Sequence, residues 1–526
     1  MSVAANSSRW KLIWLVPVFC FCVASALSGA DWPTFAHDPQ RSGWAVEEKA
    51  LKPGNVANLE LKWKVQLKNE PLSLTALTAP VVADHVKTSQ GIKTLVYVAR
   101  SRGELTAIDS VTGKIIWTRD LEVHSLPKDE SMWLCPNNLN ATPVIDKRTG
   151  TIYAIATDGR LWGLDLGNGG IKFGPAQFVP PFSKNWSLNL HDATIYTSIS
   201  QGCGGAPSGI YSMDVHDPRQ PVTRALVASK NGAGIWGRGG PVIGLNDRIY
   251  GVTGDGKFAP PDGDYGSSFI AASLRDLKVI DYFAPTNFQH VTDYDLDMAA
   301  FSPVWFASGM RNLVAGGGKE GVLYLLDAGS LGQKDHHTPL FTIKLANDDN
   351  AFQGEGIWGA PATWRDDVGE SWLYVPIYGP ASASAPSFAA THGPAPHGCT
   401  MAFKVEIHSG TQEPTLTPEW VSGDLDLPDP PAVANGVIFV LSTGENPMQT
   451  TGGKVIFTHQ KILTNQQREA DTHNAVLYAL DARTGKTLYQ SGKAMGAWTH
   501  FSGLAVADGQ VYAVDHDSYL YCFGLK

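Results

Sequence analysis

Short alternations of apolar and polar positions recur along almost the whole chain. Residues 94–100, 248–253 and 321–328 are examples, with Gly, Asp or Asn near their ends. Alternation with a period of two predicts half-buried strands, and the flanking residues are typical of tight turns. The pattern therefore predicts an all-β protein built from many short strands.

A repeated motif follows three of these strands. Its copies are RGELTAIDSVTGKIIW (102–117), DGRLWGLDLGNGGIKF (158–173) and NAVLYALDARTGKTLY (474–489). Each copy has an Asp, a Gly four residues later and an aromatic residue four residues after that Gly. The Asp can open a turn by accepting backbone hydrogen bonds, and the Gly can adopt a positive φ. We interpret these Asp residues as structural, and we expect each aromatic side chain to pack against the next blade.

Repeats of this kind predict an eight-bladed β-propeller whose blades are four-stranded antiparallel sheets. The first seven blades are predicted at 78–121, 141–178, 190–229, 238–284, 299–346, 357–422 and 430–492. The eighth has only three strands, at 503–508, 510–514 and 518–523, so we expect 59–65 to supply its outer strand. Closing the ring with both chain ends removes an exposed sheet edge. Two insertions, 381–397 and 444–473, would be either caps over the central funnel or surface loops.

The first thirty residues have the pattern of a secretory signal peptide. Arg9 and Lys11 precede the uncharged run 12–27, and the small residues Ser28 and Ala30 follow it. We expect 1–30 to be removed and 31–526 to form one propeller domain, periplasmic or secreted. An uncleaved N-terminal anchor is the alternative. No other run is apolar and long enough to span a bilayer, so no transmembrane span is expected in the mature chain.

Composition and charge narrow the class of partner. Charged residues make up 17% of the chain, below the usual value of about 25%. The net charge of −9 argues against nucleic acid as a partner.

Outside the leader the cysteines are Cys135, Cys203, Cys399 and Cys522. A Cys135–Cys203 disulfide is the pairing we expect in an exported chain, and free buried thiols are the alternative.

The opening segment 31–63 and the repeat AIDSVTGKIIW resemble the quinoprotein, or PQQ, propeller family and its PQQ-dependent alcohol dehydrogenases. The resemblance extends over 31–526. It implies a propeller fold and a PQQ cofactor held with Ca²⁺ or a lanthanide. The same repeat also builds propellers without catalysis, such as outer-membrane assembly factors, so the resemblance alone does not assign a function.

The segment GIWGRGGPVIGLNDRIYGVTGDGKFAP (234–260) resembles the part of the dehydrogenases that places a Trp beneath the quinone and an Asn on the metal. Trp236 matches that Trp, and a flat aromatic face suits a planar ring system. Asp255 stands at the Asn position, where a carboxylate could still bind Ca²⁺. Packing between blades is the alternative role for Trp236.

The segment VTDYDLDMAAF (291–301) contains Asp293, Asp295 and Asp297 at alternate positions, which would point the same way in an extended segment. In the dehydrogenases an Asp in this region is the general base. The resemblance therefore makes Asp297 and Asp295 the catalytic candidates, with Asp297 also a candidate metal ligand. A solvated acidic loop is the alternative.

The segment AGGGKEGVLYLLD (315–327) places Lys319 where the family keeps a cation beside the quinone carbonyl. Such a cation would stabilise charge that develops on the reduced ring, so Lys319 is a catalytic and a cofactor-binding candidate. An ordinary turn lysine before a strand is the alternative.

Three departures separate the chain from the dehydrogenases. Pro207 stands where the family has a metal-binding Glu, Cys135 is followed by Pro136 rather than a second cysteine, and Asp255 replaces Asn.

These observations leave three hypotheses for the function of the chain. The first is an exported propeller whose funnel binds a ligand or partner without turnover. The second is a divergent PQQ-dependent dehydrogenase of alcohols or sugars. The third is a scaffold in envelope assembly; the sequence names neither a small-molecule nor an envelope partner.

Overall fold

The structure is a computed structural model, and it describes residues 1–2, 30–67, 77–100, 103–122, 141–200, 202–230, 232–349, 354–448, 463–500 and 502–526. The predicted signal segment and Cys135 fall outside these residues, apart from residues 1–2 and Ala30. Among the described helices, none has the length and apolar character that crossing a bilayer would require.

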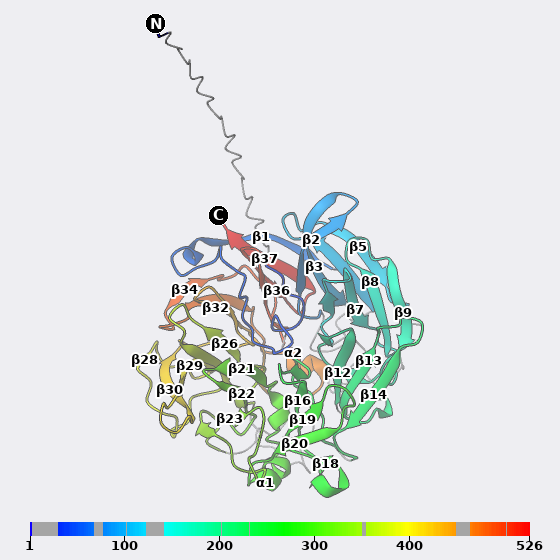
Figure 1. Ribbon diagram of the computed structural model, residues 1–526. Helices are drawn as coiled ribbons and strands as arrows, with labels where there is room; N and C mark the ends of the chain where they lie inside the picture. The colour runs from blue at the N-terminus through cyan, green and yellow to red at the C-terminus, as the bar shows by residue number, and fades with distance from the viewer. Residues whose placement is uncertain are drawn as a thin grey trace.

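The described strands form eight sheets of four or more strands, arranged as blades around a central axis (Figure 1). Blade 1 contains β2 (Val81–Thr88), β3 (Gly91–Arg100), β4 (Glu104–Asp109) and β5 (Ile115–Asp120). Blade 2 contains β6 (Val144–Asp146), β7 (Thr151–Ile155), β8 (Arg160–Asp165) and β9 (Ile171–Gln177). Blade 3 contains β10 (Lys184–Asn185), β11 (Asn189–His191), β12 (Thr194–Ser200), β13 (Gly209–Asp214) and β14 (Val222–Val227).

The middle of the chain forms two more blades. Blade 4 contains β15 (Val242–Ile243), β16 (Arg248–Val252), β19 (Phe269–Ser273) and β20 (Val279–Phe283). A small hairpin joins its second and third strands and consists of β17 (Phe258–Ala259) and β18 (Asp264–Tyr265). Blade 5 contains β21 (Val304–Ser308), β22 (Arg311–Gly316), β23 (Val322–Asp327) and β24 (Phe341–Lys344).

The last three blades complete the ring. Blade 6 contains β25 (Gly356–Ile357), β26 (Ala362–Arg365), β27 (Ser371–Tyr378), β28 (Ala390–Thr391), β29 (Gly398–Ile407) and β30 (Pro414–Val421). Blade 7 contains β31 (Ala432–Ala434), β32 (Val437–Ser442), β33 (Val476–Asp481) and β34 (Thr487–Gln490). Blade 8 contains β35 (Ala505–Ala507), β36 (Gln510–Val514), β37 (Tyr519–Leu525) and β1 (Leu59–Gln66). The short helices are η1 (Val56–Asn58), η2 (Cys203–Gly205), η3 (Pro260–Asp262), α1 (Phe288–Asp293), η4 (Met298–Ala300) and α2 (Asn465–Glu469).

The predicted architecture is confirmed, including the way in which the ring closes. β1 pairs antiparallel with β37, from Leu59 opposite Leu525 to Gln66 opposite Tyr519. The two ends of the chain therefore share one blade, and Figure 1 shows β1 beside β37.

The repeat motif locks neighbouring blades together. Trp117 packs against Gly169 of the next blade and donates its indole N–H to the carbonyl of Leu166 at 2.9 Å. Trp63 likewise donates its indole N–H to the carbonyl of Ser110 in the next blade, and Trp420 donates to the carbonyl of Ala482. A Cβ on Gly169, which has a φ of 67°, would lie 2.7 Å from the Trp117 ring, so glycine is required there. The predicted packing of Trp117 on the next blade is confirmed.

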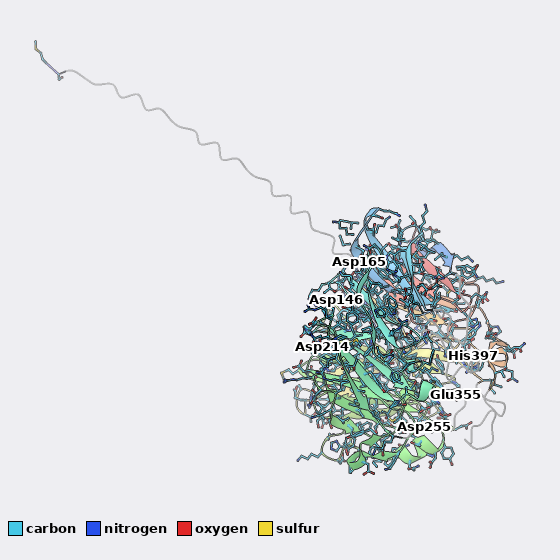
Figure 2. The ribbon with its side chains drawn as sticks, turned by 90° about the vertical axis from the view of Figure 1, so that its right-hand side faces the viewer. Asp146, Asp165, Asp214, Asp255, Glu355 and His397 are labelled. Carbon is cyan, nitrogen blue, oxygen red and sulfur yellow. The ribbon has the colours of Figure 1, made fainter. Side chains whose placement is uncertain are left out.

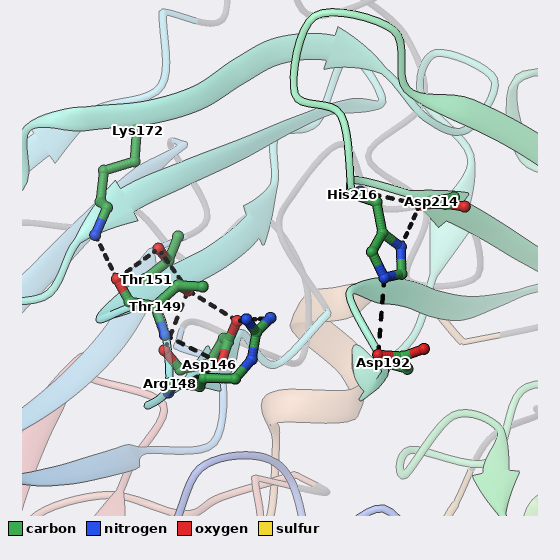
Figure 3. A network of polar contacts seen from close by, with 8 residues as sticks. All are labelled: Asp146, Arg148, Thr149, Thr151, Lys172, Asp192, Asp214 and His216. Carbon is green, nitrogen blue, oxygen red and sulfur yellow. Dashed lines mark hydrogen bonds and ion pairs between the residues drawn. The ribbon is translucent and has the colours of Figure 1, made fainter.

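The motif aspartates are structural in the way the sequence predicts. Asp109 Oδ1 accepts the backbone N–H groups of Val111 at 3.0 Å and Thr112 at 2.9 Å. Asp146, which is outside the motif, likewise accepts hydrogen bonds from the turn that follows it, from the backbone N–H of Arg148 and the hydroxyl of Thr149 (Figure 3). Figure 2 places Asp165 and Asp214 towards one face of the ring, and Asp255 and Glu355 towards the opposite face, which we call the site face.

Replacing Trp117 with alanine is expected to lower the free energy of unfolding by about 3–5 kcal/mol, because a buried indole leaves a cavity between two blades. Trp117→Phe keeps most of the packing and loses the hydrogen bond, so it should cost only about 1 kcal/mol. Denaturant titration of the three proteins would measure both values. Equal losses for the two variants would contradict the cavity argument.

Residues 32–48, which we call the N-terminal strap, form hydrogen bonds with each of the eight blades in order. Its contacts with blades 1 to 7 are Trp32–Val82, Pro33–Ile145, Thr34–Leu188, Pro39–Ile243, Gln40–Trp305, Ser42–Thr363 and Gly43–Val433. Glu48 then accepts the N–H of Gly509 in blade 8 at 2.8 Å. The buried Arg41 adds hydrogen bonds to Phe35 and Leu188, both at 2.9 Å. One segment near the axis therefore ties all eight blades together.

His37 of the strap gives the fold a pH dependence. Its imidazole is buried, with Nε2 3.3 Å from Glu47 and Nδ1 3.7 Å from Asp38. Burial alone would lower the pKa of His37, but the two carboxylates outweigh it and raise this pKa to about 9.

We therefore expect the folded state to lose up to about 3 kcal/mol between pH 6.5 and pH 9, because the native imidazole keeps its proton over this range and the unfolded one does not. The contribution is complete below pH 6.5 and disappears as the pH rises through 9. His37→Gln should remove this slope, which denaturant titration at several pH values would show. Parallel curves for the variant and the natural chain would contradict the assignment.

The two predicted insertions differ. In 381–397, β28 pairs in parallel with β30 of blade 6 and extends that sheet, so this segment is a surface loop. In 444–473, the described part contains α2, which lies at the centre of the ring in Figure 1. Arg468 of α2 is buried and forms an ion pair with Glu445. The described part of this second segment therefore covers part of the axis.

Candidate active site

The five predicted site residues come from four loops of blades 4 and 5, and Asp295 and Asp297 share one of these loops. Trp236 precedes β15, and Asp255 follows β16. Asp295 and Asp297 lie between α1 and η4, and Lys319 lies between β22 and β23. The polypeptide between Trp236 and Lys319 returns to the same face at each of these loops, so residues far apart in sequence meet there.

Three carboxylates form the centre of this cluster. Ligand atoms from Asp255, Asp295 and Asp297 all lie within 4.8 Å of one another. Asp297 Oδ1 accepts the backbone N–H of Asp255 at 2.8 Å. Lys319 Nζ donates to Asp295 Oδ1 at 2.7 Å and to Asp297 Oδ2 at 2.8 Å. The Lys319 side chain is only 5% exposed, so these charges interact away from bulk water.

Glycines allow this close approach. A Cβ on Gly254 would lie 2.3 Å from Asp297 Oδ1 and 3.1 Å from Trp236 Nε1. A Cβ on Gly318 would lie 2.6 Å from Met298 Cα and 2.7 Å from the carbonyl of Asp297. Any larger residue at either position would push the loops apart.

An aromatic wall borders the carboxylates. Lys319 Nζ lies 5.4 Å from the ring centroids of both Trp236 and Trp358. The two indoles meet edge to face at 63°, and Trp358 stacks on Tyr378 at 5.5 Å with 9° between the planes. The ammonium therefore binds two carboxylates and contacts two indole faces, where cation–π attraction adds to the ion pairs.

The charges of the cluster perturb its pKa values strongly. Burial, reinforced by the Asp297 and Asp295 carboxylates, raises the pKa of Asp255 to about 10. Burial raises the pKa of Asp295 to about 7, although Lys319 opposes the shift. Burial also opposes ionisation of Asp297, but Lys319 outweighs it and holds this pKa below its ordinary value. The three carboxylates outweigh burial at Lys319 and raise its pKa.

The donor set fits a hard cation. Three carboxyl groups surround one ammonium, and a cation bound between them would favour their ionised form, because it offsets the repulsion that raises the pKa values of Asp255 and Asp295. Asp255 Oδ1 is buried and has no hydrogen-bond partner in the described part of the chain. Oxygen donors of this kind are the ligands that Ca²⁺ and similar ions prefer.

Comparisons with known proteins relate the chain to a propeller family and to alcohol dehydrogenases. Residues 26–202 match a family model, PQQ_2, described as outer membrane protein assembly factor BamB. The chain is 23% identical over 248 residues to 1-butanol dehydrogenase (cytochrome c) of Thauera butanivorans, covering 44% of this chain and 33% of the relative. It is 29% identical over 149 residues to quinohemoprotein alcohol dehydrogenase of Comamonas testosteroni, covering 28% and 18%. The chain thus spans a third or less of the length of these relatives.

Solved structures show the same fold. The Comamonas testosteroni quinohemoprotein alcohol dehydrogenase superposes with a TM-score of 0.58 at 15% identity, covering 94% of this chain and 80% of that one. A europium-containing methanol dehydrogenase superposes with a TM-score of 0.57 at 11% identity, covering 94% and 98%. The chain is an eight-bladed propeller, and residues 26–202 match the PQQ-repeat family model. Its sequence relatives include both the quinohemoprotein alcohol dehydrogenases and the BamB-type propellers.

The structure brings together the five residues predicted from the sequence, Trp236, Asp255, Asp295, Asp297 and Lys319. The extended arrangement predicted for the three alternating aspartates is wrong. Asp293 ends α1, is exposed and accepts a hydrogen bond from Gln289, whereas Asp295 has a φ of 53°. Asp255 provides the third carboxylate of the cluster instead.

Trp358 and Tyr378 were not predicted from the sequence. The tetrapeptide GIWG occurs twice, at 234–237 and 356–359, and this repetition was the available signal for Trp358. Tyr378 carries no comparable signal, because it reaches the site only through the pairing of blade 6.

Two of the departures from the dehydrogenases concern Pro207 and the cysteines. Pro207 has no side-chain donor for a metal, and its carbonyl accepts the hydroxyl of Tyr211 at 3.0 Å. Cys203 is disulfide-bonded, and Cys399 and Cys522 are free and buried. Cys135, the partner predicted for Cys203, lies outside the described residues.

Proposed function

We propose that this PQQ-repeat propeller holds PQQ and a hard cation, Ca²⁺ or a lanthanide, and oxidises the hydroxyl group of an alcohol or sugar. The observation that supports this most is that four separate loops of two blades bring together Trp236, Asp255, Asp295, Asp297 and Lys319. The relatives in sequence include two alcohol dehydrogenases, one of them a quinohemoprotein.

The residues present suit both groups. Asp255 and Asp297 would hold the cation, with Asp255 Oδ1 offering a buried oxygen. Trp236 offers an aromatic face for a planar ring, and Lys319 a cation beside it. When bound, PQQ would supply the two-electron acceptor that alcohol oxidation requires.

Of the two predicted bases, Asp295 fits the role better than Asp297. Both oxygens of Asp297 already accept hydrogen bonds, from the Asp255 N–H and from Lys319. Asp295 accepts a hydrogen bond from Lys319 at Oδ1. Asp297 and Lys319 would then position Asp295.

Reconstitution tests the proposal directly. Purified protein would be titrated with PQQ in the presence of Ca²⁺ or a light lanthanide, and alcohol-dependent reduction of an artificial electron acceptor would be followed. Binding of PQQ by calorimetry together with turnover is the expected result. If PQQ does not bind with any of these metals, the dehydrogenase proposal fails.

A second candidate is a funnel that binds its ligand or partner without turnover, including a role in envelope assembly. Pro207 favours it, because the carboxylate that the dehydrogenases use at this position is missing. The match of 26–202 to the BamB family model is compatible with it. PQQ retention without reduction of any acceptor would support this candidate over the first.

We also propose export to the periplasm or beyond. The leader pattern in 1–30 supports it, and the relatives include a family described as an outer membrane assembly factor. Mass spectrometry of protein from a Gram-negative host would test it, since cleavage should leave Asp31 at or near the N-terminus.

A further inference from the structure

A pocket of about 420 Å³ lies on the face of the ring opposite the site face. Its lining includes the turn at Asn435 and Gly436, between β31 and β32, and Asp481 at the end of β33. Asp481 ends the third strand of blade 7 as Asp165 ends the third strand of blade 2, and Figure 2 places Asp165 on the face opposite Asp255. The volume is within the range of small-molecule sites, roughly 300–1,000 Å³. The chemistry proposed above does not use this pocket.

Hydrogen bonds hold one wall of the pocket in place. This wall consists of residues 44–53, the end of the N-terminal strap and the turn after it. The backbone N–H of Ala45 donates to the carbonyl of Val433 in β31 at 2.8 Å. Asn435 Nδ2 donates to the carbonyl of Leu51 at 3.0 Å. The wall is therefore fixed to blade 7, and the pocket is preformed.

Two indoles form the apolar part of the lining. Trp44 is half-buried, and Trp364 in β26 is 7% exposed. A Cβ on Gly436 would lie 3.6 Å from Pro53 Cγ and 3.8 Å from Trp364 Cη2, so three segments meet at the floor of the pocket. Neither indole N–H makes a hydrogen bond within the part of the chain that the structure describes. Flat apolar surfaces of this kind suit the ring of a ligand.

Two cations of the lining are unpaired. The side chains of Lys52 and Arg365 are exposed and make no ion pair with any residue that the structure describes. The neighbouring carboxylates do not offset them, because both bind another cation. Arg483 lies 3.3 Å from Asp366 and also contacts Asp367.

The other charged groups of the lining already have partners. Glu48 accepts backbone N–H groups with both of its oxygens, and Asp481 accepts those of the turn that follows it. Lys49 Nζ donates to the carbonyl of Val46 at 2.8 Å. The groups that remain open to a ligand are therefore hydrogen-bond donors, two of them positively charged, and they favour an anion.

We propose that this pocket binds a small organic acid whose carboxylate is joined to a ring. The ring would lie against Trp44 and Trp364, and the carboxylate would accept hydrogen bonds from Lys52 and Arg365. An acidic sugar and an aromatic acid both have this chemistry. The pocket shares no residue with the candidate active site, so the proposal does not depend on PQQ binding or on alcohol oxidation.

Calorimetry with the full chain tests the pocket, with D-glucuronate as the acidic sugar and 4-hydroxybenzoate as the aromatic acid. Glucose and phenol are their neutral counterparts. At least one acid should bind tenfold or more tightly than its counterpart, about the contribution of one charge-assisted hydrogen bond. The acid that binds identifies the kind of ring. Acetate, which has no ring, should bind more weakly than this acid.

Exchanging both unpaired cations tests their role. The double variant Lys52→Met, Arg365→Met should weaken binding of the acid about 10- to 100-fold and leave the neutral counterpart unchanged. Trp44→Leu should weaken both about 2- to 10-fold, because both rings lose the indole. Lys114→Met is the matched control, since Lys114 is exposed in the turn between the third and fourth strands of blade 1, on the same face and outside the lining.

Salt and thermal unfolding separate binding from a structural effect. Raising the ionic strength should weaken binding of the acid but not of the neutral compound. The double variant should keep its Tm, because both side chains are exposed. Three results would each overturn the proposal: neither acid binds, an acid binds no more tightly than its neutral counterpart, or the double variant retains full affinity. Failure of PQQ to bind would count against the proposed oxidation and not against this pocket.

Discussion

Replacing Asp295 with asparagine should lower the turnover of the PQQ-loaded protein about 100- to 10,000-fold, the range expected when a general base is lost. The amide keeps the size of the side chain and can still accept the hydrogen bond from Lys319, but it cannot take the hydroxyl proton. Because the substrate is still bound by its other contacts, the loss should fall mainly on kcat. Steady-state kinetics with an artificial acceptor would measure it.

Asp293→Asn is the control for this experiment. Asp293 lies two residues away and has the same chemistry, but it is exposed and bonds only Gln289 among the described residues. It should leave turnover unchanged. If Asp295→Asn retains full activity while Asp297→Asn abolishes it, the base is Asp297 and the assignment made here is wrong.

The fold could be predicted from the sequence because its rules are local. Asp109, Gly113 and Trp117 specify a turn and a contact with the next blade within nine residues, and the motif recurs at Asp165 and Asp481. Each copy has the same physical reason, namely a carboxylate that accepts turn N–H groups and a glycine with a positive φ. Repetition of one local rule is enough to define a ring of blades.

The site was predictable only in part, because much of it depends on contacts between distant segments. The resemblance to the dehydrogenases supplied Trp236, Asp255 and Lys319. The spacing of Asp293, Asp295 and Asp297 was misleading, because α1 and the left-handed backbone at Asp295 replace the extended segment that alternation would need. Tyr378 could not be assigned in this way, since only the assembled ring places it beside Trp358.

Ending the chain at Asp517, which removes β37, is expected to prevent folding of the whole propeller. β37 lies between β1 and β36, so its loss leaves two unpaired edges and opens the ring. Leu520, Tyr521, Cys522 and Phe523 are fully buried. Burial of side chains like these contributes about 1.5–3 kcal/mol each, so together they approach the total stability of a typical protein, about 5–15 kcal/mol.

The truncated chain should therefore be insoluble or lack a cooperative unfolding transition, as seen by calorimetry and circular dichroism. Removal of Lys526 alone is the control, because this exposed residue lies beyond β37 and its loss should change Tm little. A synthetic peptide covering 518–526, added during refolding, should restore part of the native transition if strand pairing is the cause. A truncated protein that unfolds cooperatively near the original Tm would show that the strap, which contacts all eight blades, closes the ring without the shared blade.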